Sequence, residues 1–379
     1  MTHRERLIAA ISHEQPDIVP IDFGGTVNSS IVVEGYEKLK QHFGIEAENK
    51  ILNRMMRIVE VDERVLRTLD IDTRGVFTEP AITEKDQEFV PDRYRDSWGI
   101  ERVKPAHSFY YDQISFPLAG EITIADISKY SWPDPDDPGI VQGLKERLQW
   151  IRENTDCAAI LRVPAPFVHT SQYLRGFEDW YCDLALNAKV IEVLFDAILE
   201  ITLQMAKNIL KEVGQEVDVI TCGDDLGTQR GLQISHDHYV KYIKPRHAKY
   251  FRQIHDLSPA KLLFHTCGSV ANIIEDLIES GVDALNPVQV AAKGMDPVVL
   301  KQGYRGRMAF WGAIDSQQVL PYGSVSAVKN MVAERIEQLG AGGGYILAAV
   351  HNIQPDVPVE NILAMFQFAR EYVPSFAKA

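Results

Sequence analysis

The sequence lacks the features that would place it in several large classes of protein. Its four cysteines lie far apart and include no CxxC pair, which argues against a disulfide framework. No stretch approaches the roughly 20 apolar residues needed to cross a bilayer, and the first residues form no apolar signal segment. We therefore expect a cytoplasmic protein that does not enter the membrane.

Positive charge is also scarce. The chain has 39 Lys and Arg against 53 Asp and Glu, a formal net charge of −14. Binding to phosphate backbones favours clustered positive charge, so nucleic acid is not expected as a partner. What is present is apolar: 45% of the 379 residues are hydrophobic and 9% are aromatic, too many for a disordered chain. This length predicts two domains or one large α/β barrel.

From about residue 140, short apolar runs alternate with long amphipathic stretches. This alternation predicts βαβ units and a parallel sheet. A doubly wound sheet would carry a Gly-rich phosphate turn after its first strand, and none occurs here. We therefore predict an α/β fold, a single (β/α)8 TIM barrel over residues 1–379, with an eighth strand that the pattern does not place. The candidate strands are residues 74–78, 158–163, 217–221, 261–265, 282–286, 308–312 and 345–350.

Two segments do not follow this alternation. Residues 1–70 are predicted to form a helical N-terminal extension, in which Thr2 can cap the first helix. Residues of about 90–120 alternate and turn like a β-hairpin, and a proline-rich connector follows at residues 131–138. We interpret the second segment as an insertion in the barrel and not as a separate domain.

Polar side chains follow most of the predicted strands. In a barrel of this type the chemistry lies at the carboxyl ends of the strands. One polar strand end would mean little, but so many on one rim indicate a working pocket. The residues that end or follow strands in this way are Arg162, Asp224, Asp225, His265, Cys267, Asn286, Gln289, Asp315 and His351.

The His265-x-Cys267 pair suggests a metal site. Residues i and i+2 of a strand point to the same side, so the imidazole and the thiol can converge. Zn²⁺ prefers nitrogen and sulfur ligands in a tetrahedral set, with three from the protein where a substrate needs the fourth position. His351, at another strand end, would supply the third ligand. Two alternatives remain: a core histidine beside a buried cysteine, and a Cys-His thiol nucleophile.

Carboxylates form the second group of candidates. Asp224 and Asp225 are adjacent at a strand end, so at most one faces the pocket; the other reading is a helix cap or a solvated loop. Asp22 follows an apolar run and could also face the pocket. Trp98 could stack on an aromatic substrate, although a packing role fits it equally well.

Several motifs together resemble the uroporphyrinogen decarboxylase superfamily, in its zinc methyltransferase branch. These are Arg4–Ala10 with Pro16–Pro20, Asp96–Gly99, Gly223–Gln229, His265–Gly268, and Gly344–Gln354 with Pro355–Ile362. The similarity runs over nearly the whole chain and implies a (β/α)8 barrel. In the methyltransferase branch, which includes the methylcobalamin:coenzyme M methyltransferases and the corrinoid O-demethylase methyltransferases, zinc is held by an HxC motif and a distal cysteine.

Two departures from the family pattern affect the activity that the resemblance implies. Uroporphyrinogen decarboxylases grip the substrate's carboxylates with an arginine-rich N-terminal segment, but residues 19–26 contain no arginine, which disfavours that decarboxylation. At the distal ligand position His351 replaces cysteine. A zinc with one thiolate fewer is a stronger Lewis acid, and this favours polarising an ether or alcohol oxygen.

We therefore expect a zinc-dependent methyltransferase that moves a methyl group between a small substrate and the cobalt of a partner corrinoid protein. The favoured substrate is a methoxylated aromatic, and a homodimer is the default assembly. Zn²⁺ would be held by His265, Cys267 and His351. Asp224 and Asp225 are the catalytic candidates, and substrate contacts are expected from Asp22, Trp98, Arg162, Gln229, Asn286, Gln289 and Asp315. The alternatives are a decarboxylase or other lyase using pocket carboxylates, and a non-enzymatic barrel that binds a corrinoid or its protein.

Overall fold

The centre of the protein is a parallel sheet whose strands follow one another in the chain. The computed structural model describes residues 1–83 and 86–377. Seven strands pair in parallel in the order β13-β12-β11-β10-β9-β8-β3. They are β3 (Thr73–Val76), β8 (Ala158–Arg162), β9 (Val219–Gly223), β10 (Lys261–His265), β11 (Ala284–Val288), β12 (Ala309–Ile314) and β13 (Tyr345–Ala349). The apolar runs of the sequence correspond to these strands within a few residues.

Residues 20–22 occupy the eighth position, which the sequence did not reveal. Ile21 bridges Leu347 of β13 in parallel, and the Asp22 N–H donates to the Leu347 carbonyl at 2.9 Å. On the other side, the Asp72 N–H donates to the Ile21 carbonyl at 3.1 Å, just before β3. This segment joins the two ends of the sheet, so the predicted TIM barrel is confirmed. Few backbone pairs form because the segment is short and Pro20 has no N–H to donate.

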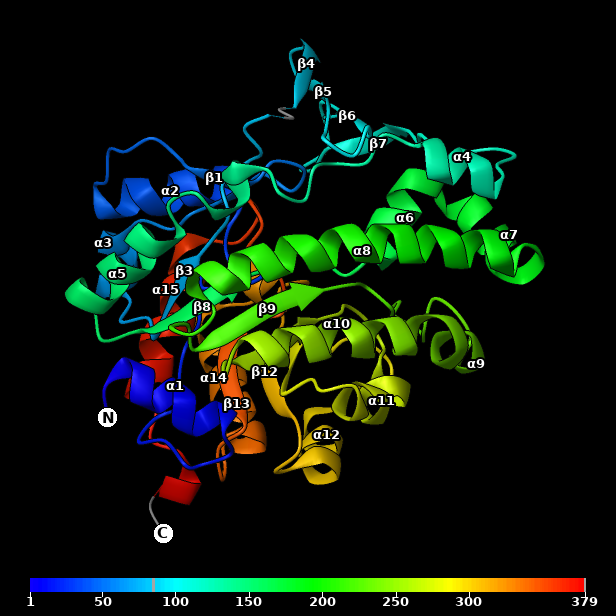
Figure 1. Cartoon of the computed structure of the whole chain (residues 1–379). Coiled ribbons are helices and arrows are strands. Elements are labelled where there is room, and N and C mark those ends of the chain that lie inside the picture. Colours follow the sequence, from blue (N-terminus) through cyan, green and yellow to red (C-terminus); the bar gives the residue numbers. More distant parts are fainter. Residues whose placement is uncertain (84–85, 378–379) are drawn as a thin grey trace.

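Helices connect successive strands and surround the sheet (Figure 1). They are α5 (Leu144–Asn154), α6 (Val168–Arg175), α7 (Phe177–Leu186), α8 (Ala188–Val213), α9 (His236–His238), α10 (Lys244–Leu257), α11 (Ile274–Glu279), α12 (Pro297–Tyr304), α13 (Val319–Tyr322), α14 (Val325–Leu339) and α15 (Val359–Glu371). A π-helical turn, η2 (Tyr239–Ile243), joins α9 to α10. Short 3-10 segments occur at η1 (Pro138–Val141), η3 (Ala271–Ile273) and η4 (Ser375–Ala377).

The N-terminal segment is only partly the helical extension that the sequence predicts. It contains α1 (His3–Ile11), α2 (Val33–Phe43) and α3 (Glu63–Thr68), and a small antiparallel pair, β1 (Ile51–Asn53) and β2 (Ile58–Val59). Thr2 caps α1 through a capping box with Glu5. The expectation of a wholly helical extension is too simple, because residues 20–22 of this segment belong to the barrel itself.

The insertion forms a four-stranded antiparallel sheet and not a single hairpin. Its strands are β4 (Gln87–Val90), β5 (Arg93–Arg95), β6 (Glu101–Val103) and β7 (Asp112–Ser115), followed by α4 (Ile124–Lys129). In Figure 1 this sheet projects at the top, whereas both chain termini lie at the lower left. The insertion and the termini therefore lie at opposite ends of the molecule.

Two layers of apolar side chains fill the fold. Alternate strand residues, such as Ile160 and Leu263, form the barrel interior, and Leu7 and Ile11 of α1 complete that cluster. The intervening residues, such as Leu161 and Phe264, belong to the larger cluster shared with the helices. Because strand side chains alternate between the two faces, this fixes which residues near each strand end point into the barrel.

None of the helices in the described part of the chain is both long enough and apolar enough to cross a membrane.

Candidate metal centre

Strand register places three of the predicted residues inside the barrel mouth. Ala158 and Ile160 of β8 face the interior, so Arg162 at the end of the same strand also points inward. By the same alternation, Leu263 places His265 inward. Asn286 follows from Ala284 in β11, and His265 and Asn286 are register partners on neighbouring strands.

His265, Cys267 and His351 converge at this mouth. One ligand atom from each residue can be chosen so that all three lie within 4.8 Å of one another. The Cys267 Sγ lies 3.4 Å from the His265 Nε2, and the two imidazole rings have centroids 5.7 Å apart. Two ring nitrogens and one sulfur in this arrangement form a donor set that suits Zn²⁺ and leaves a fourth position for another ligand.

Hydrogen bonds orient His265 for this role. Its Nδ1 lies 2.5 Å from the Oδ1 of Asn286, which can only accept, so Nδ1 carries the proton. The Nε2 therefore presents a lone pair, which accepts from the Asn28 Nδ2 at 3.1 Å. Fixing the tautomer through the other ring nitrogen is how proteins commonly prepare a histidine for a metal.

Burial shifts the pKa values of the three side chains and so affects which of them carries a proton. It lowers the pKa of His265, although Asp225 opposes the shift. Burial and the neighbouring His265 lower the pKa of His351 to about 4. Burial raises the pKa of the Cys267 thiol well above its usual range, and Asp225 adds to this effect. At neutral pH both imidazoles are neutral ligands, whereas the thiol keeps its proton until a cation displaces it.

Asp225 is the carboxylate of the Asp224-Asp225 pair that faces the mouth. Its Oδ1 accepts from the Cys267 backbone N–H at 2.8 Å and lies 3.7 Å from the His265 Nε2. Its Oδ2 lies 3.3 Å from the Nε2 of His169 on α6. Burial alone would raise the pKa of Asp225, but His169, His265 and the Cys267 amide together lower it. The result is an ionised carboxylate beside the three candidate ligands.

Asp224, the other carboxylate of the pair, contacts the start of α6. Its carboxylate is fully buried and accepts from the backbone N–H groups of Phe167, Val168 and His169 at 3.0 to 3.2 Å. It also lies 3.1 Å from the Nε2 of the buried His247. Asp224 therefore caps the N-terminus of α6, where an anion is favourable. Of the alternatives that the sequence left open for Asp224, these contacts support a helix cap.

A cavity of about 230 Å³ opens beside the cluster. His265, His351, Asp225 and Arg162 line it together with side chains from the N-terminal segment and α6. Its other lining residues are Val27, Asn28, Asn53, Met55, Met56, Val163, Ala165, His169, Thr170, Tyr173, Thr221, Cys222 and Gly223. Sequence reasoning missed His169 and Asn28. A search for titratable residues just beyond each strand end would have found His169, but Asn28 is brought in only by the tertiary fold.

Of the seven predicted substrate residues, Arg162 lines this cavity and the other six do not, among them Asn286, which instead contacts His265. Asp22 is fully buried and accepts from the Trp311 Nε1 at 2.8 Å and the Thr73 Oγ1 at 2.6 Å. Asp315 accepts from the backbone N–H groups of two following residues, and Gln229 is exposed. Gln289 is buried, and its Oε1 accepts from the Gly268 N–H at 2.7 Å, which holds the loop after Cys267. These four side chains therefore lie outside the described wall of the cavity.

Trp98 lines a second cavity, of about 310 Å³, that also reaches Arg162. The indole packs edge-on against Trp132, with ring centroids 6.3 Å apart. Trp98 therefore has the packing contact that the sequence allowed and also lies at a cavity wall, whereas its stacking on an aromatic substrate stays a prediction.

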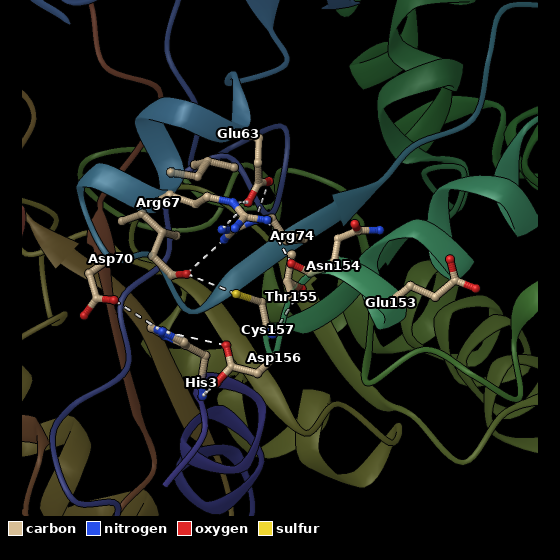
Figure 2. Close-up of a pocket in the computed structure, with 12 residues that line it drawn as sticks. His3, Glu63, Arg67, Asp70, Arg74, Glu153, Asn154, Thr155, Asp156 and Cys157 are labelled. Carbon is tan, nitrogen blue, oxygen red and sulfur yellow. Dashed lines mark hydrogen bonds and ion pairs between the residues drawn. The ribbon is translucent and has the colours of Figure 1, made fainter.

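A third cavity, of about 420 Å³, lies at the opposite end of the barrel, before β3 and β8 (Figure 2). His3, Asp70 and Asp156 point toward one another, as do Arg74 and Glu63, whereas Glu153 points away from both groups (Figure 2). His3 contacts Asp70 and Asp156, while Arg74 forms two hydrogen bonds with Glu63. At the amino ends of barrel strands such networks typically serve stability. We therefore assign this cavity no chemistry.

Fold and site together define a (β/α)8-barrel with a His-Cys-His cluster at the carboxyl ends of its strands. The sequence profile described as uroporphyrinogen decarboxylase (URO-D) matches residues 111–372, and the chain belongs to this family. Uroporphyrinogen decarboxylase from Methylococcus capsulatus (strain Bath) is 24% identical over 266 residues, which cover 66% of this chain and 70% of the relative. A methyltransferase from Methanosarcina mazei has the same fold, with a TM-score of 0.67, 18% identity, and coverage of 98% of this chain and 99% of its own.

Proposed function

We propose that this protein is a zinc-dependent methyltransferase that moves a methyl group between a small substrate and the cobalt of a corrinoid held by a partner protein. The convergence of His265, Cys267 and His351, with donor atoms within 4.8 Å of one another, carries the proposal. Family membership supports an enzyme of the decarboxylase and methyltransferase group, and the likeness to the Methanosarcina mazei methyltransferase supports the fold.

The electrostatics of the cluster favour a metal site over a thiol nucleophile. A Cys-His nucleophile works as a thiolate beside an imidazolium, which requires a low thiol pKa and a high imidazole pKa. Here the shifts are opposite, because burial raises the pKa of Cys267 and lowers that of His265. A divalent cation would offset the cost of ionising the buried Cys267 thiol, since coordination stabilises the thiolate.

The charge of the cavity disfavours uroporphyrinogen as the substrate. That molecule carries eight carboxylates, whereas Arg162 is the only lysine or arginine among the described residues lining the cavity. The Asp22 region, where the family's arginines are expected, instead buries a carboxylate in the barrel. A small substrate with at most one anionic group matches the charge of this cavity better than uroporphyrinogen does.

We favour demethylation of a methoxylated aromatic as the reaction. It breaks the O–CH₃ bond of the ether and forms a Co–CH₃ bond on the corrinoid, and the phenolate that leaves takes up a proton. Bound zinc would supply Lewis acidity at the ether oxygen, strengthened because the set contains one thiolate and two neutral imidazoles. Asn286 orients His265, Asp225 holds the Cys267 amide, and Tyr173, Met55 and Met56 offer apolar surface to a ring.

A decarboxylase or other lyase is the second candidate. The 24% identical Methylococcus capsulatus protein and the Asp225-His169 pair, whose side chains lie 3.3 Å apart beside the cavity, support it. This candidate requires neither metal nor corrinoid.

The test is a methyl-transfer assay with zinc-loaded protein, a reduced corrinoid protein and a set of methoxylated aromatics. We expect the absorbance of methylcobalt to develop with release of the phenol. The His351→Ala variant and the metal-stripped protein should both be inactive. Equal product formation by metal-stripped protein, or CO₂ release without a corrinoid, would favour the lyase and contradict the proposal.

A further inference from the structure

Arg162, which is half-buried, differs from the buried arginines in having no partner among the described residues. Arg74 pairs with Glu63, Arg102 with Asp96, and Arg175 with Asp183. Arg162, in contrast, forms no hydrogen bond and no ion pair with any residue in the ranges 1–83 and 86–377. The chain has 53 carboxylate side chains and a net charge of −14, so the missing counterion is not explained by a shortage of acids.

An unpaired guanidinium in this position is energetically costly. Arg162 lies inside the barrel mouth, where its side chain is only partly accessible. Burying a charge without a partner carries a penalty that hydrogen-bonded pairing reduces. A cation that the protein itself does not neutralise is therefore ready to bind an anion from outside.

The position of Arg162 connects this anion to the proposed reaction site. Arg162, Ala165 and Thr170 line both the 230 Å³ cavity, whose wall includes His265 and His351, and the 310 Å³ cavity beside Trp98. Strand β9 lies between β8, which carries Arg162, and β10, which carries His265. Two strand spacings amount to about 10 Å, a gap that one aromatic ring with its substituents can bridge.

We propose that Arg162 determines substrate specificity by pairing with a carboxylate of the substrate, while the methoxy group lies at the His-Cys-His cluster. This inference rests on the proposed function in that it assigns the site's substrate class: an aromatic ether that carries one carboxylate. The planar guanidinium matches a carboxylate with two parallel hydrogen bonds, a geometry that lysine does not reproduce.

The test is calorimetric binding to zinc-loaded protein in the absence of any corrinoid. The probes are 4-methoxybenzoate and its neutral counterpart 4-methoxybenzamide, each also as the 3-methoxy isomer. We expect the better benzoate to bind about 10- to 100-fold more tightly than its amide. Arg162→Gln should remove this preference and leave amide binding within about twofold. Arg162→Lys should keep only part of the preference for the benzoate over the amide.

Arg307→Gln is the matched control, because it removes the same charge from an exposed pair with Glu275 just before β12, at the opposite end of the barrel. It should leave both affinities unchanged. Thermal unfolding of Arg162→Gln should match or exceed that of the wild type, since no ion pair is lost, and this confirms that the variant folds.

Three results would overturn the inference: equal binding of benzoate and amide by the wild type, an equal loss of both in Arg162→Gln, or no binding of either. Weaker binding of free cobalamin by Arg162→Gln, with benzoate binding unchanged, would also overturn it by assigning the anion to the corrinoid.

The proposed function and the role of Arg162 can fail separately. Carboxylate binding that depends on Arg162, without methyl transfer, would contradict the proposed function alone. Demethylation of neutral ethers by the wild type as efficiently as of carboxylated ethers would contradict only the role of Arg162.

Discussion

At the residue scale, Asn286 determines which nitrogen of His265 is available to a metal. Its Oδ1 accepts the Nδ1 proton at 2.5 Å, and its buried Nδ2 has no hydrogen-bond partner among the residues that the structure describes. Asn286→Ala should therefore weaken zinc binding about 10- to 100-fold, the usual effect of losing such an orienting contact. Competition with a chromophoric chelator measures this. Asn286→Asp keeps the acceptor and loses no bonded donor, so it should retain wild-type affinity; a loss as large as in the alanine variant would contradict the assigned orientation.

The pKa shifts of the three ligands predict the protons that zinc displaces. Burial lowers the pKa of both imidazoles, that of His351 to about 4, so His351 binds no proton at pH 6, where an ordinary histidine with a pKa of about 6.5 is mostly protonated. The Cys267 thiol, whose pKa is raised, has a proton to release. Zinc binding should release about one proton per metal at pH 7.5, and His351 should add none when the pH is lowered to 6. Calorimetry in buffers of different ionisation enthalpy gives this number, and a rise towards three at pH 6 would contradict the protonation states.

At the element scale, Asp224 attaches α6 to the end of β9. Asp224→Ala removes three acceptor contacts at a helix N-terminus and the contact with His247, and should lower the free energy of unfolding by about 3 kcal/mol. Asp315→Ala is the control, because Asp315 also accepts from two backbone N–H groups but is partly exposed, so water can replace it. Urea unfolding measures the free energy of unfolding that each of the two variants loses. Equal losses would show that Asp224 is no more than an ordinary turn residue.

The sequence predicted most of the barrel and part of the site for identifiable physical reasons. Buried parallel strands such as β10 appear as short apolar runs, and their polar ends marked His265 and Cys267. An apolar run ends at residues 20–22, but we did not predict its place in the sheet, because Pro20 interrupts it and only one bridge joins it to β13. Which of Asp224 and Asp225 faces the cavity depends on where α6 begins, and Asn28 reaches the site from 237 residues away. Neither fact is encoded in local periodicity.

At the scale of the whole molecule, Asp72 joins both ends of the chain to the barrel. It is fully buried, and it accepts from His3, Arg6 and Arg370 and from the Ile21 N–H of the closing strand. Breaking such a buried network by Asp72→Asn should cost about 3 kcal/mol of unfolding free energy at pH 7. Zinc content should not change, because the network lies at the opposite end of the barrel from the metal cluster.

The pH dependence of this cost follows from the pKa of Asp72. Burial alone would raise that pKa, but His3, Arg370, the Ile21 amide and Arg6 together lower it. A carboxyl whose pKa is lower in the folded state stabilises the fold above the unfolded pKa of about 4, and this contribution is lost as the pH falls further. The difference between wild type and Asp72→Asn should therefore shrink between pH 7 and pH 3 in urea unfolding. A difference that grows in acid would contradict the ionised network.

The most direct test of the account is the metal content of protein purified without added metal, measured beside His265→Ala, Cys267→Ser and His351→Ala. The account predicts about one zinc per chain in the wild type and its loss in each variant. Zinc that survives only the His351 change would keep the His265-Cys267 pair and move the third ligand to Asp225, whose Oδ1 lies 3.7 Å from the His265 Nε2. Absence of metal from the wild type, even after zinc is supplied, would contradict the proposed methyltransferase and leave the metal-free lyase as the better explanation of the site.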